Sequence, residues 1–586
     1  MNNIQKLSLR CAKKSVRACL LLSAVLLACA CSDTWDEHYD TAAVRDFDGT
    51  TLDYLASDGS LSQFYNIVVA TGFDDQLSSS QVLTVFAPEN DTFNYDSLVS
   101  LISEGKDESV LERFVKNHVT LYNINIGSDE QEVTLLNEKL VEVGTLSTLT
   151  VDDVSVTTAN ISCSNGIIQV LDGYLDYKAN IFERLEILNE AYLAEIGGDE
   201  DSTVTLYNFL LKYDEEELDE DQSVAIGLNE DGNTEYIDSV TIHNNDVLEA
   251  LNAYLYREDS TYMVIYPTEE AYAERVELNA KYFNFGYAYS SDEAYRDSMQ
   301  TYYANYFAMT DLIFNMNDNQ HDTDSLFSTS YNRSNWEYNV FYNPYEAGGI
   351  LDPSTIEEEI ECSNGTIYLV NEYPYTIYDA FYQEIKCEGE SMRYIETSTD
   401  YSWYNSYTGY TTYSNSADSI SDGRYLYIYS TSSSRQTSIG FQIPNTLSGS
   451  YDIYIRTLPQ SVRVTDSATI ASSLPAQYRF SLYERSSSAG TWPSSATTTF
   501  RNPEDDSRNY VIDAFNIDTL YIGTYEFTNS YYGASDAGVL LQMESYVTTS
   551  ARNTYTKELY LDCIILKPSE ATSDDEEEED AESETE

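Results

Sequence analysis

The same four residues, Cys-Ser-Asn-Gly, occur twice in this chain, at 163–166 and at 362–365. Each copy lies between apolar residues that alternate with polar ones, which is typical of strands with one buried face. Asn-Gly between two such runs predicts a type I′ hairpin, because that turn needs positive φ at both central residues. The repeat therefore predicts two similar core hairpins, in which Cys163 and Cys362 are small buried residues.

Two further segments recur in the same order before the hairpins. Residues 82–93 and 261–272 each predict a buried strand that a proline, Pro88 or Pro267, ends before a helix begins. Residues 111–124 and 299–314 both predict amphipathic helices. The shared order of strand, helix and hairpin indicates a domain-sized duplication.

This order of elements resembles the fasciclin domain. The first copy contains three motifs of that family: the strand and turn that end at Pro88, the pair Asn117-His118 in a helix, and Asn165-Gly166 in the final hairpin. The resemblance covers residues 45–176 and implies a compact α+β fold, a twisted β-wedge flanked by small helices. It also implies adhesion or ligand binding, not catalysis.

The second copy, residues 177–376, resembles the same family less closely. Tyr306 is expected at the position of the histidine, and Asn371 replaces the aspartate that follows the first hairpin. The resemblance implies the same wedge in this part of the chain. For His118 there are two interpretations: an adhesion contact, which the resemblance implies, or a local hydrogen bond that holds a helix against the sheet.

The amino-acid composition changes in residues 377–570, where Ser, Thr and Tyr are the most common residues. Short alternating runs separated by turn residues predict an all-β domain, an antiparallel β-sandwich. The runs are 424–430, 437–443, 451–458, 478–484, 519–527, 539–546 and 558–568. The last run resembles the final strand of galactose-binding and carbohydrate-binding jelly rolls. Cys387 and Cys563, near the two ends of this domain, are expected to be neighbours, with or without a disulfide.

An aromatic segment at 400–416 is the candidate ligand-binding site. Trp403, Tyr404, Tyr407, Tyr410 and Tyr413 stand there among Ser, Asn and Gly residues. Flat amphipathic rings stack on the apolar faces of sugars, while hydroxyl and amide groups satisfy the sugar hydroxyls. The alternative is that a chain with 53 tyrosines places several of them in any loop.

Charge excludes some classes of partner. The chain has 31 basic and 99 acidic residues, a formal net charge of −68. A nucleic-acid-binding protein needs a basic surface, and a bare anionic membrane would repel this chain. The sequence contains no calcium-binding loop of the D-x-[DN]-x-[DN]-G type, and we expect neither a metal nor a cofactor.

Residues 1–28 predict a signal peptide. A basic segment without acids precedes the apolar run 18–28, which is too short to span a bilayer. The run ends in Leu-Leu-Ala-Cys, which resembles a bacterial lipobox and implies cleavage before Cys29 and its acylation, with Cys31 as the alternative. The acidic linker 29–44 resembles the surface-export signals of some Gram-negative lipoproteins. At the other end, 571–586 is so acidic that we expect a disordered tail.

Together these features predict a non-catalytic lipoprotein of the outer membrane, facing the cell exterior, for adhesion or for binding a glycan or a surface protein. Resemblance implies an accessory role beside a TonB-dependent nutrient importer with its lid lipoprotein. One alternative is a structural partner that docks on other envelope proteins. Another is a glycoside hydrolase with two catalytic carboxylates, although the sequence lacks G-x-S-x-G, H-E-x-x-H and P-loop motifs.

Overall fold

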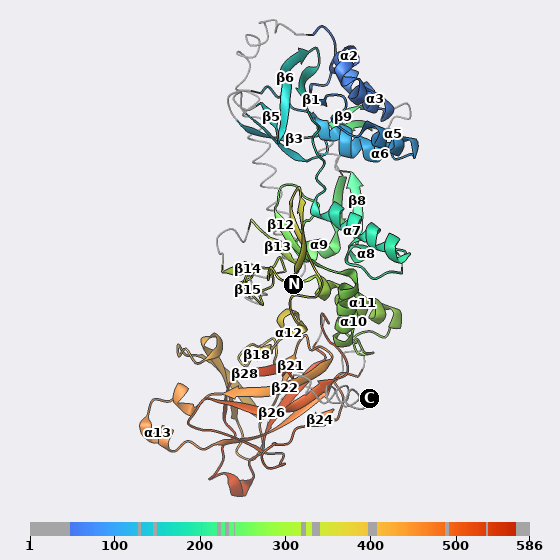
Figure 1. The fold of residues 1–586 in the computed structure, drawn as a ribbon. Helices are drawn as coiled ribbons and strands as arrows, with labels where there is room; N and C mark the ends of the chain where they lie inside the picture. Colours follow the sequence, from blue (N-terminus) through green and yellow to red (C-terminus); the bar gives the residue numbers. More distant parts are fainter. Residues whose placement is uncertain are drawn as a thin grey trace. The chain divides into compact units, whose positions relative to one another are not determined.

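The computed structural model describes residues 47–126, 130–144, 149–200, 202–218, 224–228, 234–238, 241–317, 324–330, 340–396, 407–486, 492–534 and 537–569. The chain divides into two compact units (Figure 1). Unit 1 contains residues 1–178 and 223–239, and unit 2 contains residues 179–222 and 240–586. The predicted signal peptide with Cys29 and Cys31, the acidic linker, the acidic tail, Trp403 and Tyr404 all lie outside the described residues.

Unit 1 is a mixed sheet with helices on one face (Figure 1). Its helices are α2 (Thr51–Ser57), α3 (Ser62–Ala70), α4 (Asp74–Ser78), α5 (Tyr95–Ser103) and α6 (Asp107–Val110). Its strands are β1 (Leu83–Pro88), β2 (Val119–Thr120), β3 (Gln131–Thr134), β4 (Leu140–Val143), β5 (Thr150–Val151), β6 (Val154–Cys163) and β7 (Gly166–Leu171). The spatial order is β2-β1-β7-β6-β5-β4-β3. The strand pair β9 (Val224–Leu228) and β10 (Thr234–Asp238) also falls within unit 1.

Strand β1 is buried on both faces because two apolar clusters meet at the sheet. Val85 and Ala87 pack with the helices, whereas Phe86, which points the other way, packs with residues of β3, β4 and β5. Alternate residues of a strand point to opposite faces, so a continuous apolar run serves both clusters. This arrangement is the α+β wedge that the sequence predicts for this part of the chain.

The first part of unit 2, residues 179–222 and 240–376, is called here the fasciclin-like part. Its helices are α7 (Ile181–Ile196), α8 (Leu206–Leu211), α9 (Asp246–Ala250), α10 (Glu269–Tyr282) and α11 (Glu293–Met309). Its strands are β8 (Asp214–Leu218), β11 (Thr241–Asn245), β12 (Tyr262–Pro267), β13 (Ile313–Asn315), β14 (Ser325–Phe327), β15 (Val340–Tyr342), β16 (Ile356–Cys362) and β17 (Gly365–Val370). Four of these strands form a sheet in the order β13-β12-β17-β16.

The two hairpins have the same topology. In unit 1, β7 pairs in parallel with β1 from Leu83–Gly166 to Pro88–Leu171. In unit 2, β17 pairs in parallel with β12 over the same length, beginning at Tyr262–Gly365. The order β2-β1-β7-β6 in one sheet therefore corresponds to β13-β12-β17-β16 in the other. The duplication inferred from the tetrapeptide is thus a duplication of fold.

Two predicted helices are shorter than expected. The helical residues of segment 111–124 end at His118, after a π-helical turn at Leu111–Val115, and the chain then enters β2. Segment 299–314 leaves its helix after Met309 and enters β13. The prediction of continuous helices was wrong. A short apolar run at the end of a buried helix has the same composition as a short buried strand, so the sequence pattern does not distinguish the two.

Residues from 377 onward form a β-sandwich, called here the sandwich, with two short helices, α12 (Ile377–Ala380) and α13 (Ser467–Ala471). One sheet contains β18 (Ile385–Glu388), β19 (Thr408–Ser414), β20 (Arg424–Ser430), β22 (Gly449–Thr457), β26 (Asp518–Phe527) and β28 (Leu559–Pro568). The other contains β21 (Ser438–Ile443), β23 (Ala476–Glu484), β24 (Thr498–Thr499), β25 (Tyr510–Ile512) and β27 (Val539–Ser545). Each of the seven predicted runs overlaps one of these strands.

The core of the sandwich also takes in residues from the fasciclin-like part. Phe283, which follows α10, stacks on Phe307 of α11 with ring centroids 5.1 Å apart, and Tyr532 packs edge-on against both rings. The Ser530 amide donates to the Asn284 carbonyl at 2.7 Å. Within unit 2, the apolar core therefore crosses the sequence boundary predicted at residue 377.

Candidate functional site

The first Asn-Gly corner holds a helix and a loop against the sheet of unit 1. The Asn165 Oδ1 atom accepts a hydrogen bond from the Thr51 amide at 2.7 Å, at the start of α2. Its Nδ2 group donates to the carbonyl oxygens of Leu77 and Ser79, both at 2.8 Å. Asn165 is only 4% exposed, so water cannot replace these bonds if the side chain is lost.

The second corner repeats this arrangement in unit 2. The Asn364 Oδ1 atom accepts from the Ile181 amide at 2.8 Å, at the start of α7. Its Nδ2 group donates to the carbonyl oxygens of Leu255 and Arg257, at 2.7 and 2.9 Å. The conserved chemistry of the repeated tetrapeptide is therefore a buried amide that connects three segments distant in the sequence.

The glycine of each corner is required by the strand that passes beside it. A Cβ atom at Gly166, whose φ is 156°, would lie 2.0 Å from the carbonyl oxygen of Leu83, and at Gly365 the equivalent distance is 1.8 Å. The two turn residues Ser164 and Asn165 do not have positive φ, so the prediction of a type I′ turn was wrong. The hairpin is where the sequence predicts it, but close backbone approach is the reason for glycine.

Pro88 is buried at the end of β1, opposite Leu171 of β7. Directly after it the chain leaves the sheet, and the Glu89 amide donates to the Leu171 carbonyl at 3.0 Å. The Asn90 side chain then donates to the Gly59 carbonyl at 2.8 Å, which connects the turn to the 3-10 helix Gly59–Leu61 that precedes α3. These contacts are structural ones.

His118 is completely buried between two backbone groups. Its Nδ1 atom lies 2.7 Å from the Phe114 carbonyl oxygen, and its Nε2 atom accepts a hydrogen bond from the Leu175 amide at 2.9 Å. These contacts require the neutral tautomer with hydrogen on Nδ1. Burial lowers the pKa of His118 to about 4. An inaccessible neutral imidazole holds the helix end to the segment after the sheet, which favours the local hydrogen-bond interpretation over an adhesion contact.

Strand register identifies the counterpart of His118 in unit 2. In unit 1, Val85 of β1 pairs with Val119, and in unit 2 the equivalent residue of β12, Val264, pairs with Ile313. The residues that precede Val119 and Ile313 therefore correspond, so His118 corresponds to Leu312. The expectation that Tyr306 holds this position was wrong. It came from aligning the two predicted helices, whereas the pairing of the strands that follow them aligns His118 with Leu312. Counted from the ends of β7 and β17, Leu175 corresponds to Pro374, which has no amide hydrogen to donate.

The aromatic residues proposed as a ligand-binding loop do not share one face. Of the three that the structure describes, Tyr407 is exposed just before β19, while Tyr410 and Tyr413 lie within that strand. Tyr410 is paired with Ile428, which faces the sandwich core, and Tyr413 is paired with Tyr425, which faces away from it. Alternation within a strand separates them, so the grouping of Tyr410 with Tyr413 was wrong.

A different aromatic group covers the outer face of this sheet. Its members all point away from the sandwich core and are called here the tyrosine stack: Tyr413, Tyr425, Tyr427, Tyr429 and Tyr560. The Tyr427 ring lies 4.8 Å from that of Tyr560 and 5.1 Å from that of Tyr429, both stacked. The Arg463 guanidinium lies 4.5 Å from the centre of the Tyr427 ring. The alternating Tyr residues of 424–430 were the sequence signal for this group.

A cavity of about 240 Å³ lies beside the tyrosine stack, and Tyr560 belongs to both. Hydroxyl, amide and carboxylate side chains line much of its wall, among them Gln460, Thr469, Ser473 and Glu558. Burial raises the pKa of Tyr560, so its hydroxyl remains protonated at neutral pH. An aromatic ring beside hydroxyl and amide groups suits a neutral polyhydroxylated ligand.

The two cysteines of the sandwich are neighbours without a disulfide. Strand β18 pairs with β28, where Cys387 lies opposite Ile564 and Glu388 lies opposite Cys563. The two thiols therefore point to opposite faces of the sheet. Burial raises the pKa of both thiols to about 12, which keeps them protonated and unreactive.

Comparison with known proteins identifies part of the chain. The fasciclin domain model matches residues 59–177. These residues form a fasciclin domain. Transforming growth factor-beta-induced protein ig-h3 from Sus scrofa is 29% identical to the chain over 138 residues, which are 22% of this chain. The chain spans only 20% of the length of that curated relative.

Solved structures align at low similarity. The FAS1 domain pair of the insect cell adhesion molecule fasciclin I is 12% identical, covering 55% of this chain and 99% of its own, with a TM-score of 0.20. A family 35 carbohydrate binding module from Clostridium thermocellum is 7% identical, covering 32% and 98%, with a TM-score of 0.17. Paenibacillus xanthan lyase is 13% identical, covering 35% and 16%, with a TM-score of 0.20. Such scores assign neither fold nor function.

The fasciclin domain contains all four predicted motif residues, Pro88, His118, Asn165 and Gly166, and each has a structural contact. In the described part of the chain, no helix combines the length and apolar character needed to cross a membrane. The cavity beside the tyrosine stack lies in the sandwich, and none of these four motif residues lines it.

Proposed function

We propose that this protein is a non-catalytic binding protein of the outer membrane surface. The fasciclin domain supports an adhesion-type function, and the sandwich supplies the ligand site. The observation that carries the proposal is the cavity beside the tyrosine stack, whose lining contains a tyrosine and several uncharged hydrogen-bonding side chains. A glycan is the ligand class that this chemistry fits best.

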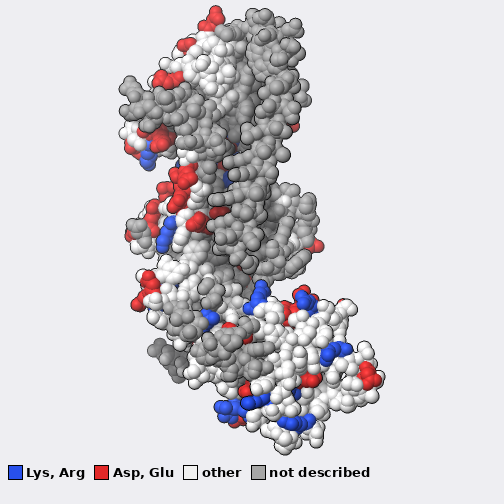
Figure 2. Space-filling model, turned by 180° about the vertical axis from the view of Figure 1, so that it is seen from behind, with Lys and Arg blue, Asp and Glu red and all other residues white. Residues whose placement is uncertain are grey.

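The charge distribution supports placing the ligand on the sandwich. On the face shown in Figure 2, most visible Lys and Arg side chains lie on the sandwich, at the bottom of the view. Acidic side chains are the more common charged residues elsewhere on that face. The net charge of −68 repels anionic partners in general. Electrostatic repulsion of a polyhydroxylated or weakly anionic surface is therefore expected to be weakest at the sandwich, where basic side chains are more frequent on this face.

A glycan array tests the ligand class. We expect wild-type protein to bind a set of neutral glycans, and the variant Gln460→Ala, Glu558→Ala to lose about tenfold or more of its affinity because two hydrogen-bonding side chains of the cavity are lost. Glu526→Gln, an exposed change on β26 that does not line the cavity, is the control and retains full binding.

Three outcomes separate the alternatives. If the Trp403→Ala, Tyr407→Ala variant loses binding while the cavity variant still binds, the site lies in the segment 400–416 that is proposed from the sequence. Equal binding by all proteins would contradict both sites. Absence of binding by wild-type protein would favour the structural partner that docks on other envelope proteins.

Acylation at the N-terminus gives the proposed location its own test. Multiple acyl chains on one cysteine hold a protein to a membrane, whereas a single chain holds it only weakly. We expect Cys29→Ser to release the protein from outer membranes into the soluble fraction, and Cys31→Ser to leave it bound. The reverse result would assign the anchor to Cys31, and membrane binding by neither or both would contradict this proposal. Copurification with a TonB-dependent importer and its lid lipoprotein tests the accessory role.

A further inference from the structure

The two-stranded ribbon of the fasciclin-like part brings metal-ligating side chains to one face. Strand β8 pairs with β11 so that Glu216 lies opposite His243 and Asp214 lies opposite Asn245. Residues two apart in a strand share a face, and so do residues directly opposite each other. All four side chains therefore belong to the same face of the ribbon.

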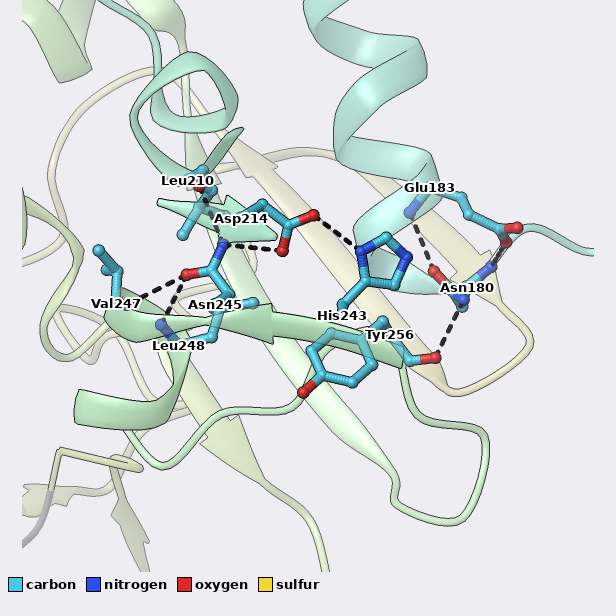
Figure 3. A network of polar contacts seen from close by, with 9 residues as sticks. All are labelled: Asn180, Glu183, Leu210, Asp214, His243, Asn245, Val247, Leu248 and Tyr256. Carbon is cyan, nitrogen blue, oxygen red and sulfur yellow. Dashed lines mark hydrogen bonds and ion pairs between the residues drawn. The ribbon is translucent and has the colours of Figure 1, made fainter. Parts of the chain in front are cut away.

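Three of these residues converge. One ligand atom each of Asp214, Glu216 and His243 lies within 4.8 Å of the other two. Figure 3 shows Asp214 and His243 pointing toward each other, with 2.8 Å between Oδ2 and Nδ1. The His243 ring packs against the rings of Phe182 and Tyr256, each with its centroid 5.2 Å away. The imidazole is thus fixed in orientation before any ligand arrives.

An amide behind the cluster holds Asp214 in place. Asn245 donates from Nδ2 to the Asp214 Oδ1 atom at 3.3 Å and to the Leu210 carbonyl at 2.9 Å (Figure 3). Its Oδ1 atom accepts hydrogen bonds from the Val247 and Leu248 amides at the start of α9. Such supporting contacts around a ligand carboxylate are typical of metal sites.

The cluster lacks a fixed positive charge. The Asp214 side chain is 4% exposed, and among the described residues its one cationic partner is His243, which is charged only when protonated. Glu216 adds a second carboxylate without an ion pair in the described part of the chain. A carboxylate removed from water is costly unless a cation compensates it. An isolated two-stranded ribbon is also only marginally stable, so a ligand that connects both strands stabilises it.

We propose that Asp214, Glu216 and His243 bind one divalent transition-metal ion, with Zn²⁺ as the best match. Two carboxylate oxygens and one imidazole nitrogen are ligands that Zn²⁺ accepts, and water completes its coordination. Imidazole favours such borderline ions over Ca²⁺ and Mg²⁺, which prefer oxygen ligands throughout. Metal binding at Nδ1 requires the neutral imidazole with its hydrogen on Nε2, so the hydrogen that Nδ1 shares with Asp214 is exchanged through solvent for one on Nε2.

Calorimetric titration of the chelator-treated full chain with Zn²⁺ tests the proposal, with Ca²⁺ as the comparison. We expect one Zn²⁺ per chain at this site and a loss of affinity of about tenfold or more in Glu216→Gln and in His243→Gln. Glu217→Gln is the matched control, because this exposed glutamate lies on the opposite face of the same strand and its loss is expected to leave Zn²⁺ affinity unchanged within about twofold. His321→Gln controls for a second imidazole.

Two results would overturn the site. The first is no Zn²⁺ binding by wild-type protein up to about 1 mM, which would leave Asp214 and His243 as a structural pair. The second is equal weakening by Glu216→Gln and Glu217→Gln together with equal affinity for Ca²⁺, which would indicate nonspecific attraction to an acidic chain. Glu216 is exposed, so its replacement is not expected to prevent folding.

Discussion

Replacing Asn165 by alanine is expected to destabilise unit 1 by about 3 kcal/mol, because the Thr51 amide and the Ser79 carbonyl lose their partner in a buried site. The Leu77 carbonyl keeps a hydrogen bond from the Thr51 hydroxyl at 3.0 Å and adds less to the cost. Urea denaturation measures the loss, and hydrogen exchange followed by mass spectrometry locates it in residues 47–178.

The duplication supplies the comparison for this prediction. Asn364→Ala is expected to cost a similar amount in unit 2, where the Ile181 amide is the donor left without a partner. Asn66→Ala, an exposed change on α3, is the control and is expected to change stability by less than about 0.5 kcal/mol. A loss below about 1 kcal/mol for Asn165→Ala would contradict the role assigned to the repeated corner.

Acidification is expected to destabilise unit 1 through His118. The pKa of His118 is 6.5 in an unperturbed chain and about 4 in the folded protein, so the folded state keeps the imidazole neutral where the unfolded state binds a proton. Its stabilising contribution is complete above pH 6.5 and falls by about 3 kcal/mol as the pH decreases to 4. Urea denaturation at several pH values between 7 and 4 measures this slope.

A substitution taken from unit 2 isolates the contribution of the histidine. His118→Leu is expected to remove this part of the pH dependence and to cost about 2 kcal/mol at pH 7, because the Leu175 amide then has no acceptor. Adding Leu175→Pro removes that amide hydrogen and reproduces the pair Leu312 and Pro374. The two changes together are expected to cost less than the sum of their separate effects. Additive costs would show that the two residues are not coupled, and an unchanged pH slope in His118→Leu would show that another group causes the acid sensitivity.

The pair His118 and Leu175 in unit 1 corresponds to the pair Leu312 and Pro374 in unit 2, and this is one way in which the two copies differ. In unit 1 a buried imidazole satisfies a buried amide, and in unit 2 both polar groups are absent. Replacing both partners by apolar groups avoids the penalty that loss of one partner brings. The second copy therefore lacks this pair of polar groups without leaving one of the two unsatisfied.

Local sequence patterns were sufficient for the elements whose signal lies within a few residues. Alternating hydrophobicity located the seven strands of the sandwich, since the period of two is a property of each strand alone. The repeated tetrapeptide located both hairpins for the same reason. The helices at 111–124 and 299–314 were predicted too long because their last residues are buried by strands from elsewhere in the chain.

Contacts between residues distant in the sequence decided which side chains share a surface and which of them meet in a site. Composition placed Tyr410 and Tyr413 in one group, but pairing with β20 put them on opposite faces. Asp214 and His243 are separated by 29 positions, and neither lies in a recognisable metal motif. Only the register of β8 and β11 brings them together. A strand pattern specifies which residues share a face of that strand, whereas the partner strand, set by burial across the whole domain, specifies which of them meet.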